Sequence, residues 1–170
     1  MNNNLYSRQA AWVDSSQYWA IQSDQFIRLN IQMLGNAELP LIAMEAQIAR
    51  LLVKGKNDLP TSLLLTQHGA SAAYWMLGFY ELLRLLRDKH SDKFHQLSNI
   101  FRRVSVIRMP LAKHEVIGAP GYRSIQHYPT SIWCPTTGKV GWSAFEPETN
   151  AMIEIYRAEL ADEFLAIEKV

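Results

Sequence analysis

A long apolar segment in the middle of the chain, residues 61–89, constrains the fold more than any other feature. It follows the turn residues Asn57-Asp58-Leu59-Pro60, and Thr61 or Ser62 can cap a helix there. The small residues Gly69-Ala70-Ser71-Ala72-Ala73 allow another backbone to approach closely. Bulk comes from the large residues Tyr74, Trp75, Leu77, Phe79, Leu82, Leu83 and Leu86. We predict that this segment is the centre of the core, as one helix or as two helices broken near Gly69.

The same segment is not expected to cross a membrane. Gln67, His68 and Glu81 interrupt it, and the unbroken run from Gly69 to Tyr80 is shorter than the roughly 20 residues that a transmembrane helix needs. The N-terminal residues contain no apolar signal core, and the single cysteine, Cys134, cannot form an internal disulfide. These observations predict a cytoplasmic protein with no membrane partner.

Other helices are predicted on either side of this segment. The first begins at Ser15 or Ser16 and is stopped by Gly35-Asn36. The second begins near Pro40 and ends at Gly55. A later helix begins near Ser91 and Asp92, and Pro110 must kink it or end it around Met109. The apolar positions that define the first of these helices are Tyr18, Trp19, Ile21, Phe26, Leu29 and Met33.

The sequence changes character at Gly118, after which glycine and proline interrupt every helical pattern. Residues 131–134 and 140–145 are predicted to form a β-hairpin, and a closing helix is predicted over residues 157–168. The stretch from Met152 to Tyr156 fits either a third strand or the first turns of that helix. The predicted fold class is mainly α, a single-domain bundle of four or five helices with a small C-terminal β-hairpin, and the domain spans residues 1–170.

Charge is distributed unevenly along the chain. The formal net charge is only +1, yet the segment from Arg84 to His114 contains eight Lys or Arg residues and two acidic ones. The last 27 residues, Ala144 to Val170, contain seven acidic residues and two basic ones. The chain is therefore electrically polar, and its basic segment ends in an Arg and a His that could serve phosphate chemistry.

A helical bundle with an Arg-x5-His segment near the end of a late helix resembles the HEPN superfamily. The residues that carry the resemblance are Arg108 and His114, and the similarity covers residues 63–115. Met109 and Pro110, which lie between the two, depart from the polar pattern of that family's motif. Many HEPN proteins are dimeric ribonucleases that need no metal, so the resemblance implies a homodimer that binds or cleaves RNA without a cofactor.

The implied chemistry gives each residue of the pair one role. The Arg108 guanidinium can hold the scissile phosphate, and the His114 imidazole can act as general base toward a ribose 2′-hydroxyl. Six residues along a regular helix separate two side chains by about 120°, so they converge only if the helix is kinked or a second subunit helps. The alternative is that Arg108 forms a structural ion pair and that His114 is an ordinary surface or core residue.

The wider basic segment also has two interpretations. Its side chains can follow a phosphate backbone, or they can form solvated helix faces that complement the acidic last helix within one molecule or across a dimer. The candidate nucleic-acid-binding residues are Arg84, Arg87, Lys93, Arg102, Arg103 and Lys113.

No sequence motif indicates a metal or cofactor. The five-residue spacing of His90 and His95 does not match the four-residue spacing of helical zinc ligands, and the chain contains no Walker, dinucleotide-binding, serine-hydrolase or zinc-protease motif. The first functional hypothesis is therefore a HEPN-like protein that binds or cleaves RNA without a metal. The second, from another class, is a non-catalytic, dimeric helical module that binds a protein partner.

Overall fold

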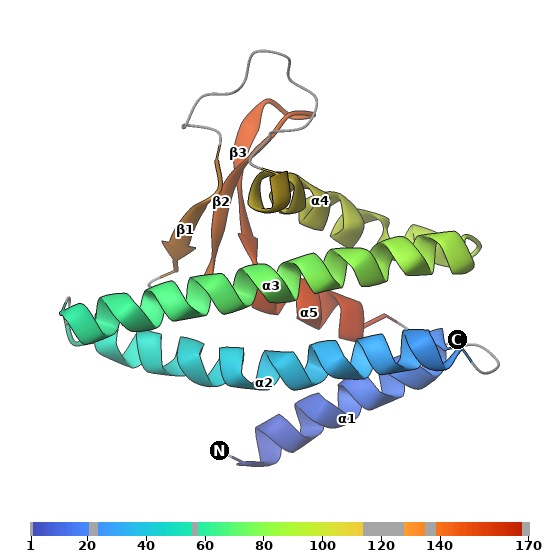
Figure 1. The fold of residues 1–170 in the computed structure, drawn as a ribbon, viewed down its shortest axis with the longest axis horizontal. Helices are drawn as coiled ribbons and strands as arrows, with labels where there is room; N and C mark the ends of the chain where they lie inside the picture. The colour runs from blue at the N-terminus through green and yellow to red at the C-terminus, as the bar shows by residue number, and fades with distance from the viewer. Residues whose placement is uncertain (1, 21–23, 56–57, 114–127, 135–138, 168–170) are drawn as a thin grey trace.

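We analysed a computed structural model that describes residues 2–20, 24–55, 58–113, 128–134 and 139–167. Within these ranges the chain forms five α-helices, a short 3₁₀ helix and one three-stranded antiparallel sheet (Figure 1). The prediction of a mainly helical bundle with a small C-terminal sheet is confirmed. Helices α2 (Gln25–Val53) and α3 (Leu59–Lys89) are the longest, and they lie side by side across the molecule.

The predicted boundary between the first two helices is wrong. Helix α1 spans Asn2–Trp19, so Ser15 and Ser16 lie inside it rather than at its start. The cap of α2 is Asp24, whose carboxylate accepts hydrogen bonds from the backbone N–H groups of Phe26 and Ile27. Helix α2 then continues through Gly35 and Pro40, where the sequence predicts a stop and a new start.

Tertiary packing explains why α2 does not stop at Gly35. A Cβ atom at this position would lie 2.6 Å from Cγ of Trp12, so glycine is needed for the close approach of α1 and not for a turn. Pro40 is exposed, so its ring meets solvent rather than a neighbouring helix. At Gly35 the local stop signal is therefore outweighed by a contact between helices.

Helix α3 is a single helix, without a break at Gly69. Asp58 caps it through the backbone N–H of Thr61, and Gly55, with φ of 67°, follows α2 as predicted. Most of its predicted core residues are buried, including Trp75 and Phe79. Tyr74 is the clear exception, because 77% of it is exposed.

The basic segment continues from α3 into a turn and a fourth helix. A short 3₁₀ helix, Phe94–Leu97, precedes α4, Ser98–Lys113, so the α-helix begins later than the predicted start at Ser91. Pro110 lies inside α4, which continues for three residues beyond it. The helix therefore does not end around Met109.

The C-terminal region forms the sheet and the closing helix. Strands β1 (Thr130–Trp133) and β2 (Val140–Glu146) form the predicted hairpin, although its loop, 135–138, lies outside the described residues. The ambiguous stretch is strand β3 (Ala151–Tyr156), which pairs with β2 in the order β1-β2-β3. Helix α5 (Arg157–Leu165) follows β3 directly.

Aromatic rings from three helices meet in the core. Phe164 of α5 stacks on Trp12 and Trp19 of α1, with ring centroids 5.6 and 6.3 Å away, and its edge meets Phe79 of α3. Trp75 packs against Phe79 and donates a hydrogen bond from its indole N–H to the Leu34 carbonyl of α2. This cluster fixes the position of α5 against α1 and α3.

Candidate functional site

Half of the predicted Arg-x5-His pair can be placed in the fold. Arg108 lies on α4 with its guanidinium 4.9 Å from the centre of the Tyr80 ring and 3.8 Å from a carboxylate oxygen of Glu81, both on α3. These contacts match the structural alternative, an ion pair within the protein. His114 lies outside the described residues, so the convergence of the pair stays a prediction.

The predicted RNA-binding residues face different parts of the molecule. Arg84 and Arg87 of α3 pair with acidic neighbours on their own helix, whereas Arg102 pairs with Glu146 of β2. Arg103 pairs with Glu159 and Glu163 of α5. Lys93 lies over the ring of Tyr18, and only the backbone of Lys113 is described. The arginines therefore lie on two helices and pair with carboxylates of α3, β2 and α5. Arg103 makes the contact with the acidic last helix that the intramolecular alternative requires.

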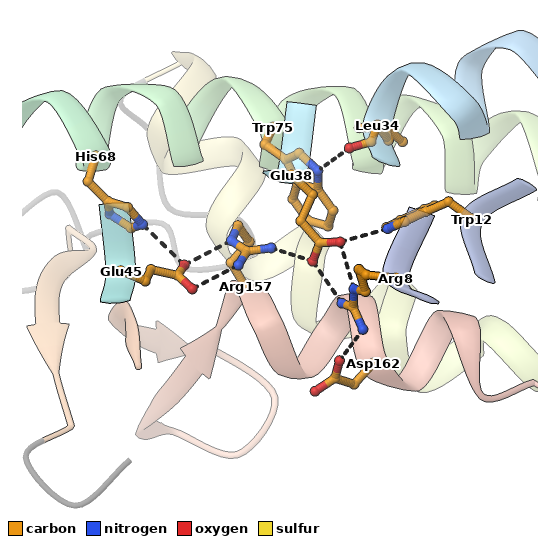
Figure 2. Close-up of polar contacts among 9 residues, drawn as sticks. All are labelled: Arg8, Trp12, Leu34, Glu38, Glu45, His68, Trp75, Arg157 and Asp162. Atoms are coloured by element: carbon orange, nitrogen blue, oxygen red, sulfur yellow. Dashed lines mark hydrogen bonds and ion pairs between the residues drawn. The ribbon is translucent and has the colours of Figure 1, made fainter. Parts of the chain in front are cut away.

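The densest polar cluster in the described chain is one that the sequence analysis did not identify. Glu38, fully buried on α2, accepts four hydrogen bonds (Figure 2). Two come from Arg8 of α1, at 2.7 and 2.8 Å, one comes from the Trp12 indole at 2.6 Å, and one comes from Arg157 at 2.7 Å. A buried carboxylate is thus compensated by two guanidinium groups and an indole.

Arg157, the first residue of α5, extends the cluster to a second carboxylate. It is fully buried, and its guanidinium donates two hydrogen bonds to Glu45 at 2.9 and 3.0 Å. The Nε2 atom of His68 lies 3.1 Å from Glu45, and because an ionised carboxylate only accepts, we assign the proton to that nitrogen. Arg8 also donates to Asp162 at 2.5 Å. The cluster consequently connects α1, α2, α3 and α5.

The charges in this cluster are mutually stabilised. Burial alone would raise the pKa of the Glu38 carboxyl, but the hydrogen bond from Arg8 and the charge of Arg157 outweigh it, so that pKa lies below its ordinary value. The pKa of Glu45 is likewise lowered, because His68 and Arg157 outweigh the effect of burial. Burial opposes the positive charge of Arg8, but Glu38 and Asp162 raise its pKa. Both carboxylates therefore stay ionised at neutral pH.

A pocket of about 270 Å³ adjoins the cluster between α1, α2 and α5. Its charged lining residues already bond to one another, so we interpret the cluster as a structural connection between helices. Among the described residues no group of three or more His, Cys, Asp or Glu side chains is arranged to hold a metal ion.

The opposite side of α2 has the reverse chemistry. Phe26, Leu29 and Met33 are 65, 55 and 57% exposed and follow one another at helical spacing. On α3, Leu63 and Tyr74 are 61 and 77% exposed. We call the surface formed by these five side chains the outer face.

Contacts with neighbouring helices locate the outer face on α2. Helix α1 contacts α2 through Gln32, Gly35 and Asn36, whereas α3 meets it at Leu34. The remaining side of α2 carries the three exposed apolar residues. Gly78 is exposed and lies beside Leu34, and Tyr74 follows one turn earlier on the same side of α3. The two sets of side chains thus flank the line of contact between α2 and α3.

The part of the outer face around Tyr74 is also uncharged. Helix α3 contains no Asp, Glu, Lys or Arg from Leu59 to Tyr80, and α2 contains only Glu38 between Leu29 and Met44. That residue is buried on the opposite side. Solvent-exposed faces of helices normally carry charged residues, so this distribution indicates a surface that meets another apolar surface.

No family model, curated protein or solved structure matches this chain. None of the helices in the described ranges is long and apolar enough to span a membrane.

Proposed function

We propose that the protein is a non-catalytic helical module that binds another protein through the outer face. The observation that carries the proposal is the combination of exposed aromatic and aliphatic side chains with an absence of charge along most of α2 and α3. Exposed apolar side chains of this kind are unfavourable in water and favourable in an interface. The buried ion-pair cluster supports this role, because it holds the two helices against the rest of the molecule.

The test is site-specific photocrosslinking of the protein in its native cells. A photoreactive residue replaces Leu29, and the matched control carries it at Met152 of β3, which is exposed to a similar extent (55 and 50%). We expect protein adducts from position 29 and none from position 152. Adducts of equal yield from both positions, or from neither, would refute the proposal.

RNA binding is a second candidate, supported by a separate observation. The Tyr80 and Phe101 rings stack with centroids 5.5 Å apart, and Arg108 and Arg87 each lie 4.9 Å from one of these rings. Arginine planes beside aromatic rings are a common surface for single-stranded RNA. The acidic partners of the arginines, above all Glu81, would have to release them first.

Cleavage of mixed single-stranded RNA in EDTA tests the catalytic form of this candidate. If Arg108 holds the phosphate and His114 is the base, the Arg108→Ala and His114→Ala variants each lose at least about 100-fold in rate. Arg28→Ala, which changes an exposed arginine on α2, is the control and should retain the full rate. Equal rates in all variants would identify a contaminating nuclease. We also propose a reducing, cytoplasmic location, on the basis of the single cysteine.

A further inference from the structure

At the centre of the outer face a large aromatic ring lies among small residues. The indole of Trp75 bonds to Leu34, and His68 bonds to Glu45, so the antiparallel helices place Tyr74 near the level of Ala37. Ala37, Ala70 and Gly78, all exposed, are the small residues around that level. A large exposed ring is thus surrounded by short side chains that leave space for a ring from another molecule.

The amount of apolar surface is close to what a stable dimer requires. At roughly 200 Å² for a full large side chain, the exposed fractions of the five outer-face residues correspond to roughly 600 Å². A standard protein interface buries about 800 Å² on each partner. The small residues around Tyr74 supply part of the difference.

The lack of charge limits the kind of partner. A face whose centre is uncharged attracts a polyanion poorly, and that centre has no pattern of charges to select one foreign protein over another. A second copy of the chain needs no such pattern, because in a two-fold pair the same apolar surface meets itself and each favourable contact occurs twice. Two antiparallel helices from each copy would then pack as a four-helix layer.

We infer that the outer face is the interface of a two-fold homodimer, with Tyr74 of each copy packed among the small residues Ala37, Ala70 and Gly78 of the other. This inference rests on the proposed function and names the partner.

Sedimentation equilibrium of the full chain, at concentrations up to roughly 50 µM, tests the inference because standard interfaces have Kd values of micromolar or below. The informative pair is Met33→Glu and Met152→Glu. The two methionines are 57 and 50% exposed, but only Met33 lies on the outer face. We expect a dimer for the native chain and for Met152→Glu. Met33→Glu should weaken association at least about 100-fold, because a two-fold interface would bury the new charge twice.

Folding of each variant is checked by circular dichroism and urea denaturation, and Tyr74→Ser provides a second, uncharged disruption. A monomeric native chain, or a dimer that resists both Met33→Glu and Tyr74→Ser, would overturn the inference. If the native chain is monomeric but binds neutral phosphatidylcholine vesicles in a Met33-dependent manner, the occupant is a lipid surface and the inference fails. If the chain is monomeric but still forms crosslinks from position 29 to a different protein, the homodimer inference fails and the proposed function stands.

Discussion

The two sides of α2 differ in whether their charged and apolar side chains have partners within the chain. The inner side holds two carboxylates, Glu38 and Glu45, in a cluster with buried arginine and histidine side chains. The outer side presents Phe26, Leu29 and Met33 to solvent. The comparison shows that this helix has two packing surfaces. The inner one places charged pairs among buried aliphatic residues and is completed within the chain, and the outer one is apolar and has no partner among the described residues.

Removal of the central carboxylate, Glu38, is expected to have the largest effect on stability. Glu38→Ala removes the acceptor of the Trp12 indole and leaves Arg8 and Arg157 with one carboxylate partner each, so we expect a loss of about 3 to 5 kcal/mol in the free energy of unfolding. Glu81→Ala on α3 is the matched control, because Glu81 is 51% exposed and pairs with Arg84 at the surface. It should change stability by no more than about 0.5 kcal/mol in urea denaturation. Similar losses for both variants would show that the buried cluster contributes no more to stability than a surface ion pair does.

Acidification weakens the same cluster more gradually. The pKa values of Glu38 and Glu45 lie below their ordinary value of 4.5 in the folded protein, so the unfolded chain binds more protons as the pH falls through that value. Their contribution to stability is complete above pH 4.5 and is lost below it. Urea midpoints measured across this range should fall less steeply in Glu38→Gln than in the native chain. If the urea midpoint of Glu38→Gln falls with pH as steeply as that of the native chain, the lowered pKa of Glu38 is contradicted.

Two helical glycines allow the packed side of α2 to be compared with the exposed side of α3. A Cβ at Gly35 would collide with Trp12 at 2.6 Å, so Gly35→Ala should lower stability by about 1 to 3 kcal/mol. A Cβ at Gly78 would meet only the end of the Leu34 side chain at 3.4 Å. Gly78→Ala should therefore raise the stability of the dilute monomer by up to about 1 kcal/mol through helix propensity. Thermal denaturation at low concentration measures both, and a stabilising Gly35→Ala would refute the packing argument.

Local signals in the sequence predict some elements well. A helix is predicted after the turn at residues 57–60 and is present as α3, although its cap is Asp58 and not Thr61 or Ser62. Gly55 predicts the end of α2, and the spacing of strand residues predicts the hairpin of β1 and β2. Gly35 is misleading because its role is to admit Trp12, which is distant in sequence. Signals that act over a few residues can be recognised in the sequence alone, whereas the contact between Gly35 and the distant Trp12 cannot.

The ion-pair cluster is harder to predict because its partners are far apart. Arg157 bonds to Glu38 across 119 residues, and Arg8 bonds to Asp162 across 154. The sequence contains one signal, because Glu38 and Glu45 are seven residues apart and therefore lie on one side of the helix. Two charges on the side that also carries Ile31 and Leu41 indicate buried partners, although they do not say which. Likewise, Phe26, Leu29 and Met33 form a regular apolar pattern that is typical of a core, yet the core lies on another side of the helix.

The position of Arg157 near the C-terminal end of the described chain has a consequence for synthesis on the ribosome. Helices α1, α2 and α3 emerge first, and α2 then carries two carboxylates whose shared guanidinium has not yet been made. Burying Glu38 and Glu45 at that stage would leave Glu45 without its arginine, so the nascent helices should associate loosely and keep that side hydrated. Completion of α5 provides the cation, and the translated chain can then close around it in one late, cooperative step.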